Sequence, residues 1–312
     1  MILLSIIAAI LPMLIYLFFL WKFDKNEPEP IKSVLYHFIY GATAAVILGL
    51  IGSLILSFPL NLFFNEDTML LFKVIMIAPI VEELAKASLL FKTMSHKNVD
   101  NLTDGLIYGG AIGLGFGMTE NFLYFIAFGE SLSILIPIIL IRTLFSAVMH
   151  TISTATVGGM MSLAKYSSKN KYAVSTIAGL LIAMFIHFAW NFSVSFSSTF
   201  IVGLLFMLLI IIIFILTFYF SLKFENKIIQ KELADEIPSN LLSQLTSSKR
   251  FKKGWFLIPF QNKFIELTIK LAFRKHEVEI SGGNYEIYEE EIESLREEIS
   301  ILIQKQNSNN SV

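Results

Sequence analysis

Nine ionisable or amide side chains lie well inside stretches of sequence that are otherwise apolar enough to cross a membrane. They occupy four segments and comprise Glu82, Glu83, Lys86, Glu120, Asn121, Arg142, His150, His187 and Asn191. An ionisable group in the bilayer core costs roughly 3 kcal/mol or more unless it faces protein or water, so each one is a functional candidate. Carboxylates and imidazoles are the side chains that most often transfer protons or hold a catalytic metal ion.

The first of these segments carries two adjacent carboxylates and a lysine. Glu82 and Glu83 repel each other and lose hydration in apolar surroundings, which suits a pair that exchanges a proton with water. Lys86 allows a simpler interpretation, an internal ion pair with Glu82 at i,i+4. Because that pair would leave Glu83 without a partner, we expect at least one of the two glutamates to be catalytic.

The other three segments each have one small or polar face, with residues that recur every four positions. These are Gly105, Gly109, Gly113, Gly117 and Asn121, then Arg142, Ser146, His150, Thr154 and Gly158, then Gly179, Ala183, His187, Asn191 and Ser195. Small faces let helices approach closely. Counted from the expected cytosolic ends, Glu120, His150 and His187 lie about 13 to 15 residues in, ~20–22 Å deep. We therefore expect one site, assembled from four helices in the middle to outer part of the bilayer.

The composition requires membrane-spanning elements to position these groups. Hydrophobic residues make up 55% of the 312 residues and charged residues only 16%, whereas soluble domains are about a quarter charged. Seven apolar spans can be placed, near 2–21, 34–57, 68–91, 105–128, 132–163, 172–195 and 200–222. The predicted fold is all-α: a polytopic membrane protein of about seven transmembrane helices with a small cytosolic C-terminal extension. Pro137, in the long fifth span, predicts a tilt or kink there.

Lysines predict the orientation of the spans. The loops near 22–33, 92–104 and 164–171 carry lysine, and the short loops between them carry none. The positive-inside rule then puts the N-terminus outside and the C-terminus in the cytoplasm of a multi-pass cell-membrane protein. The predicted domains are a membrane core over 1–222 and a charged cytosolic extension over 223–312, partly helical, with a disordered end from Gln306.

Three motifs resemble those of a known protease family. They are Glu82-Glu83-Leu84-Ala85-Lys86, Phe116-Gly117-Met118-Thr119-Glu120-Asn121 and His187-Phe188-Ala189-Trp190-Asn191. With His150 between the last two, this ordered set resembles the PrsW family of bacterial intramembrane proteases, which is related to the CAAX prenyl endopeptidases and bacteriocin-processing proteins. The resemblance covers roughly residues 1–222. It implies an intramembrane endopeptidase that cuts a single-pass anti-sigma factor on its extracytoplasmic side, the first step of a stress response.

Residue chemistry suggests a mechanism with several open assignments. Glu82 or Glu83 acts as general base on a water molecule, and His150 or Glu120 relays the proton. His187 and Asn191 direct donors at the developing oxyanion, and Lys86, Asn121 and Arg142 are supporting residues. Glu120 stands where the CAAX enzymes carry histidine, so their water-activating pair cannot be transferred to this sequence.

Metal dependence and two other functions stay open. A divalent ion such as zinc, held by Glu120, His150 and His187, could acidify a bound water, although H-E-x-x-H is absent. A proton- or ion-coupled transporter also places carboxylates and histidines at mid-depth, but the odd span number and the lack of repeats disfavour it. CAAX-type processing of prenylated proteins is a further alternative.

Composition limits the partners and the chemistry. The expected partners are the lipid bilayer and a membrane-anchored protein substrate. A net charge of −1 leaves no basic patch for nucleic acid, and the absence of cysteine excludes thiol catalysis and thiolate metal sites.

Overall fold

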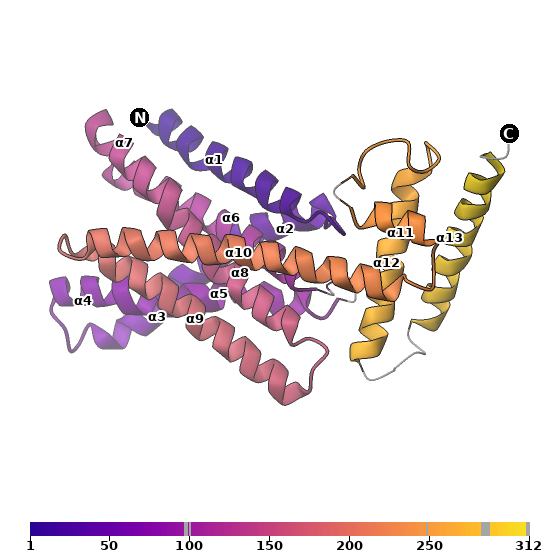
Figure 1. Ribbon diagram of the computed structural model, residues 1–312. Coiled ribbons are helices and arrows are strands. Elements are labelled where there is room, and N and C mark those ends of the chain that lie inside the picture. Colours follow the sequence, from indigo (N-terminus) through magenta and orange to yellow (C-terminus); the bar gives the residue numbers. More distant parts are fainter. Residues whose placement is uncertain (97–98, 100, 248, 282–287, 310–312) are drawn as a thin grey trace. The chain divides into compact units, whose positions relative to one another are not determined.

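The computed structural model describes residues 1–96, 99, 101–247, 249–281 and 288–309, and these residues form helices and connecting turns without strands (Figure 1). The predicted all-α fold is confirmed. The chain divides into two compact units. One comprises Met1–Asp24 and Pro28–Phe218, and the other comprises Lys25–Glu27 and Tyr219–Val312.

Six helical stretches among the described residues are long and apolar enough to cross a membrane. They are α1 (Ile2–Phe23), α2–η1–α3 (Ile31–Leu60), α6 (Leu102–Phe128), α7–η3–α8 (Leu132–Leu163), α9 (Lys169–Ser195) and α10 (Phe200–Glu232). The other predicted span also forms a continuous helix, made of α4 (Glu66–Phe72), η2 (Lys73–Ile77) and α5 (Ala78–Thr93). That helix is not among the six because it carries more charged residues, including Glu82, Glu83 and Lys86. The chain is therefore a multi-pass membrane protein.

Three of the long helices contain a single π-helical turn. The turn η1 (Gly41–Ala45) joins α2 (Ile31–Tyr40) to α3 (Val46–Leu60). The turn η2 (Lys73–Ile77) joins α4 to α5. The turn η3 (Arg142–Ser146) joins α7 (Leu132–Ile141) to α8 (Ala147–Leu163). A π-turn changes the register of side chains along a helix and is frequent at functional sites. In the span that contains Pro137, the irregular turn begins at Arg142.

The glycine stripe of α6 packs directly on the backbone of α8. A Cβ atom at Gly105, Gly109 or Gly113 would lie 2.2–2.4 Å from a carbonyl oxygen of α8, closer than any real contact. The oxygens belong, in the same order, to Gly158, Thr154 and His150. The predicted close approach is confirmed, and it holds His150 beside Gly113 with no room for a larger residue.

The second unit has a hydrophobic core of its own. It is built from the last turns of α10 and from α11 (Ser239–Leu245), α12 (Gln261–Ile280) and α13 (Glu289–Asn309). Leu233, Phe264 and Leu245 are fully buried in this core. The sequence predicted a disordered end from Gln306, but α13 continues through Asn309, and residues 310–312 lie outside the described part.

Candidate functional site

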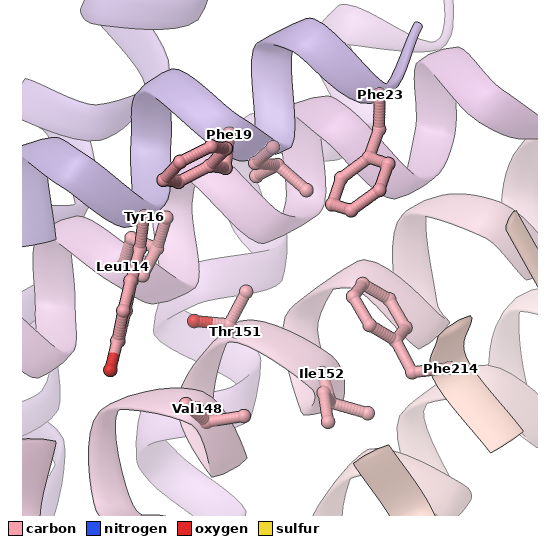
Figure 2. Close-up of a pocket in the computed structure, with 9 residues that line it drawn as sticks. Tyr16, Phe19, Phe23, Leu114, Val148, Thr151, Ile152 and Phe214 are labelled. Carbon is pink, nitrogen blue, oxygen red and sulfur yellow. The ribbon is translucent and has the colours of Figure 1, made fainter. Parts of the chain in front are cut away.

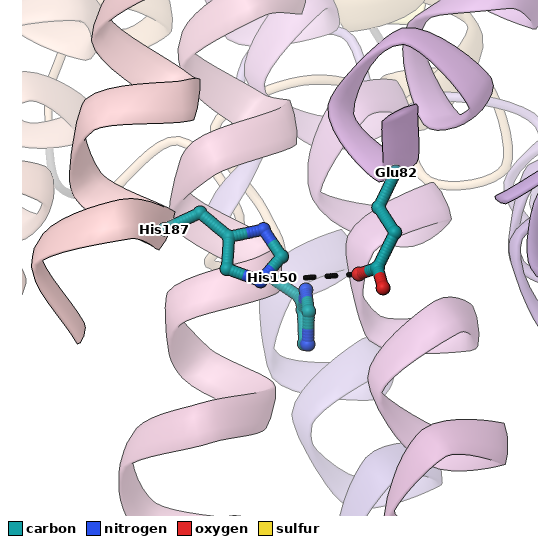
Figure 3. A group of neighbouring side chains, drawn as sticks. All are labelled: Glu82, His150 and His187. Carbon is teal, nitrogen blue, oxygen red and sulfur yellow. Dashed lines mark ion pairs between the residues drawn. The ribbon is translucent and has the colours of Figure 1, made fainter. Parts of the chain in front are cut away.

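The polar side chains of α5, α6, α8 and α9 meet in one place. Figure 3 shows Glu82, His150 and His187 converging from three of these helices. The two imidazole rings lie 4.8 Å apart in an edge-to-face arrangement, and His187 Nε2 is 3.8 Å from Glu82 Oε2. On the other side, His150 Nε2 is 2.6 Å from Glu120 Oε2. The residues that the sequence places at a common depth are thus neighbours in space.

The two adjacent glutamates have different surroundings. Lys86 Nζ donates to Glu83 Oε1 at 2.5 Å, and both side chains are completely buried. The alternative expectation of a Glu82–Lys86 pair is therefore wrong, since the lysine reaches the carboxylate three residues back. His187 Nδ1 also bonds Glu83 Oε1, at 2.8 Å. Glu82 Oε2 is a buried atom that accepts no hydrogen bond from any described residue, and the same is true of Glu83 Oε2, so the two glutamates differ in the bonds that Glu83 makes through Oε1.

Hydrogen bonds assign the protons of both histidines. Lys86 Nζ lies 3.1 Å from His150 Nδ1, and an ammonium group can only donate, so Nδ1 is an acceptor. The proton of His150 is then on Nε2, which donates to Glu120. In the same way, His187 donates from Nδ1 to the Glu83 carboxylate, which leaves the lone pair of Nε2 directed toward Glu82. Each imidazole is thus oriented by one carboxylate.

Arg142 is a buried counter-ion of Glu120. Its Nη2 atom lies 2.8 Å from Glu120 Oε2, and its side chain is only 12% exposed. Arg142 Nε donates to Asn121 Oδ1 at 3.0 Å, and the guanidinium lies 3.5 Å from the centre of the Tyr124 ring. Tyr124 was not predicted from the sequence, although its position four residues after Glu120 puts it on the same helical face.

The Asn191 side chain donates a hydrogen bond to a backbone carbonyl that loses its helical N–H donor because of a proline. In η2, the N–H of Ala78 bonds the carbonyl five residues back, at Lys73. The next N–H in this register would come from Pro79, which has none, so the Val74 carbonyl lacks a helical partner. Asn191 Nδ2 donates to that carbonyl at 2.9 Å. The amide therefore ties α9 to the helix that carries Glu82 and Glu83.

Glu82, His150 and His187 have the chemistry of a metal site. Each offers one ligand atom, and these atoms lie within 4.8 Å of one another. Two imidazoles and a carboxylate with a remaining open position form a typical ligand set for catalytic zinc. Both histidines also bond a second carboxylate, as metal-bound histidines usually do. The residues present therefore fit a divalent ion. The sequence predicted Glu120 as the carboxylate ligand, but Glu82 takes that position. Glu120 is bonded to His150 and Arg142 instead.

Two further residues shape this site. Phe116 packs on His150, with ring centres 5.1 Å apart, and on the Lys86 ammonium, 4.8 Å from the ring centre. Gly49 on α3 leaves room for Glu82, because a Cβ atom there would lie 3.3 Å from Glu82 Cγ. Gly49 was not singled out from the sequence, where it is one of several glycines in an apolar span.

A separate apolar pocket lies on another side of α8 (Figure 2). Its lining comes from α1, α6, α8 and α10 and consists of Tyr16, Phe19, Leu20, Phe23, Leu114, Val148, Thr151, Ile152 and Phe214. The Thr151 hydroxyl donates to its own helix, at the carbonyl of Ala147. This pocket therefore presents hydrocarbon to its surroundings and does not include the polar site.

Comparison with known proteins gives a consistent result. The family model described as PrsW family intramembrane metalloprotease matches residues 29–218. A protein named Protease PrsW from Clostridioides difficile (strain 630) is 29% identical over 188 residues, which is 60% of this chain and 77% of that protein. A protein of the same name from Oceanobacillus iheyensis is 29% identical over 61% of this chain and 82% of its own length. Another, from Bacillus subtilis (strain 168), is 22% identical over 59% of this chain and 80% of its own length. No solved structure matches the chain.

Proposed function

Because this chain belongs to the PrsW family of intramembrane metalloproteases, we propose that it hydrolyses a peptide bond of a membrane-anchored protein at the Glu82, His150 and His187 site. Membership of the family makes the chain a membrane protease, and the proposal concerns the residues and the substrate. One observation carries it. Glu82 Oε2 is buried without a hydrogen bond and lies 3.8 Å from His187 Nε2. That separation is too long for a direct bond and suits two groups that share a water molecule or an ion.

Glu82 is the general base in this proposal. Its side chain is 18% exposed, whereas Glu83 is completely buried and its Oε1 atom is bonded to Lys86 and His187. Glu82 removes the proton of the attacking water and later returns it to the leaving amine nitrogen. Glu83 is a positioning residue that holds the tautomer of His187. Glu120, which is 24% exposed and bonded to His150, is placed to relay a proton between this site and solvent.

A metal ion fits the same residues. His150, His187 and one carboxylate oxygen of Glu82 would hold it, which would leave the other Glu82 oxygen to act as the base. When bound, the ion would supply Lewis acidity that makes a coordinated water more acidic. Lys86 donates to His150 Nδ1, so the lysine and a metal ion compete for that atom. The carboxylates of Glu83 and Glu120 orient the two histidines whether or not an ion takes part.

The cleaved bond lies on the extracytoplasmic side in our proposal. The support is the lysine bias of the loops near 22–33, 92–104 and 164–171. With the N-terminus outside, a reporter that is active only outside the cytoplasm should signal from fusions near residues 130 and 198. It should stay silent near 168 and 240. A signal from residue 168 would contradict this orientation.

The substrate class follows from the family resemblance and from the position of the site within the helices. We propose a single-pass membrane protein, such as an anti-sigma factor. The test is proteolysis by the purified full chain in vesicles, with Glu82→Gln as the inactive variant and Glu130→Gln, an exposed loop substitution, as the matched control. Cleavage by wild type and by Glu130→Gln alone supports the proposal. Ion or proton uptake by the same vesicles, with every substrate left intact, would favour a transporter instead.

A further inference from the structure

A second group of metal-ligating side chains lies in the second unit, outside the part of the chain that matches the family model. Glu232 is the last residue of α10, and His276 and Glu279 lie one turn apart on α12. His276 Nδ1 is 3.9 Å from Glu232 Oε1 and 3.6 Å from Glu279 Oε2. The family match ends at residue 218, so none of these three residues lies in the matched region.

Two atoms of this group lack the hydrogen bonds that buried atoms normally make. Glu232 Oε1 and His276 Nδ1 are both buried, and neither has a hydrogen-bond partner among the described residues. The Glu232 side chain is only 10% exposed. Glu232 Oε1 does form an ion pair with Lys231 Nζ, at 3.3 Å, whereas the carboxylate oxygens nearest to His276 Nδ1 lie 3.6 and 3.9 Å away. More than nine in ten buried polar groups are bonded in native structures, so the unbonded His276 nitrogen between two carboxylates indicates a missing ligand.

We propose that Glu232, His276 and Glu279 form a second metal site, which binds a divalent transition-metal ion such as Zn²⁺. Tetrahedral zinc with bonds of ~2.0–2.2 Å places its ligand atoms ~3.4 Å apart. The two separations from His276 Nδ1 are 3.6 and 3.9 Å, and all three ligand atoms lie within 4.8 Å of one another, so modest side-chain movements would complete the site. An imidazole nitrogen in the set favours zinc and its neighbours over Mg²⁺ or Ca²⁺, which prefer oxygen ligands. Three protein ligands leave one position to water, so the ion exchanges with the cytosol.

Lys231 occupies the place that a cation would take. Its Nζ atom lies 3.3 Å from Glu232 Oε1 and also bonds Glu279 Oε2. The Lys231 side chain is 60% exposed, so it can turn into solvent without loss of core packing. Two carboxylates and one ammonium leave a net negative charge, which a divalent ion in place of the lysine would neutralise. The lysine and the ion are therefore competitors.

Neighbouring bonds hold the segment around Glu232 against α12 and α13. Lys275 Nζ donates to the Glu232 carbonyl and to Glu236 Oε1, both at 2.7 Å. Arg296 on α13 donates two hydrogen bonds to the same Glu236 carboxylate, at 2.7 and 3.1 Å. The end of α10 is thus fixed to α12 and α13 before any ion binds. A bound ion would add a second connection between α10 and α12 and stabilise this unit when the metal is abundant.

The test measures zinc rather than proteolysis. The full chain, purified in detergent and freed of metal, is titrated with Zn²⁺, and the zinc retained after desalting is counted per chain. His276→Gln and Glu279→Gln should each lower the zinc content by one equivalent, while His96→Gln, at an exposed histidine, should not. The loss should be the same in a His187→Ala background, which separates this site from the membrane site. Mg²⁺ in excess should not displace the zinc.

Lys231→Met gives an independent criterion. Removing the competing ammonium should tighten zinc binding roughly tenfold, because one unit charge next to the ligands is lost. If the lysine is instead the permanent partner of the carboxylates, Lys231→Met will bind no more zinc than wild type, and the proposal fails. It also fails if folded His276→Gln, with helical content equal to wild type, retains as much zinc as wild type.

Discussion

Glu82 and Glu83 should respond in opposite ways when each is replaced by glutamine. Glu82 Oε2 accepts no hydrogen bond from any described residue, so Glu82→Gln breaks no bond at that atom. We expect its stability to stay within about 1 kcal/mol of wild type. Proteolysis should fall ~10²–10⁴-fold, because the basic oxygen that activates water is gone.

Glu83→Gln should instead lower the stability of the folded protein. It removes the negative charge beside Lys86, whose ammonium is 0% exposed and 2.5 Å from Glu83 Oε1. Removing one partner of a buried ion pair costs about 3–5 kcal/mol, since the remaining charge is left without compensation. Glu83→Gln combined with Lys86→Met removes both charges and should recover most of that loss. His187 would still lose its carboxylate partner, so activity should not recover with stability.

Stability and proteolytic activity should be measured on the same preparation of each variant. Thermal unfolding in detergent gives the stability of the two single variants, the Lys86→Met variant and the double variant. Cleavage of a single-pass substrate gives their activity. A Glu82→Gln protein that is as unstable as Glu83→Gln would refute the assignment of partners. A Glu82→Gln protein that cleaves at the wild-type rate would refute its role as the base.

Further predictions concern the packing of α6, the bond made by Asn191 and the metal ion. Gly113→Ala places a Cβ atom 2.2 Å from the His150 carbonyl oxygen, so the protein should fail to accumulate in the membrane. Gly52→Ala, whose Cβ atom meets only a side chain at 3.3 Å, should accumulate normally. Asn191→Ala leaves the Val74 carbonyl unsatisfied and should cost about 1–3 kcal/mol of stability. Adding Pro79→Ala to Asn191→Ala restores a backbone N–H that can bond the Val74 carbonyl, so part of the lost stability should return. Thermal unfolding of the single and double variants measures this recovery. Exhaustive chelation should abolish proteolysis, and zinc should restore it; activity that survives chelation would leave the mechanism without a metal.

The sequence by itself determined the helical fold and the composition of the site. In lipid, a backbone must satisfy its hydrogen bonds within each segment, so long apolar stretches predict helices. Polar groups in such stretches must face protein, and recurrence every four residues identifies that face. The depth of Glu120, His150 and His187 then follows from counting, and the structure does bring them together. The glycine stripe of α6 was predictable for the same reason, because only small residues allow so close a contact.

The tertiary structure decided which group pairs with which. Lys86 can reach a carboxylate three or four residues back, so spacing alone could not distinguish Glu83 from Glu82. The choice depends on His187, which comes from a helix 104 residues further along the chain and bonds Glu83. Likewise, the bond of Asn191 to the Val74 carbonyl depends on a π-turn followed by Pro79. Spacing describes one helix at a time, whereas hydrogen-bond partners depend on the rotation and register of two helices against each other, and only packing sets those.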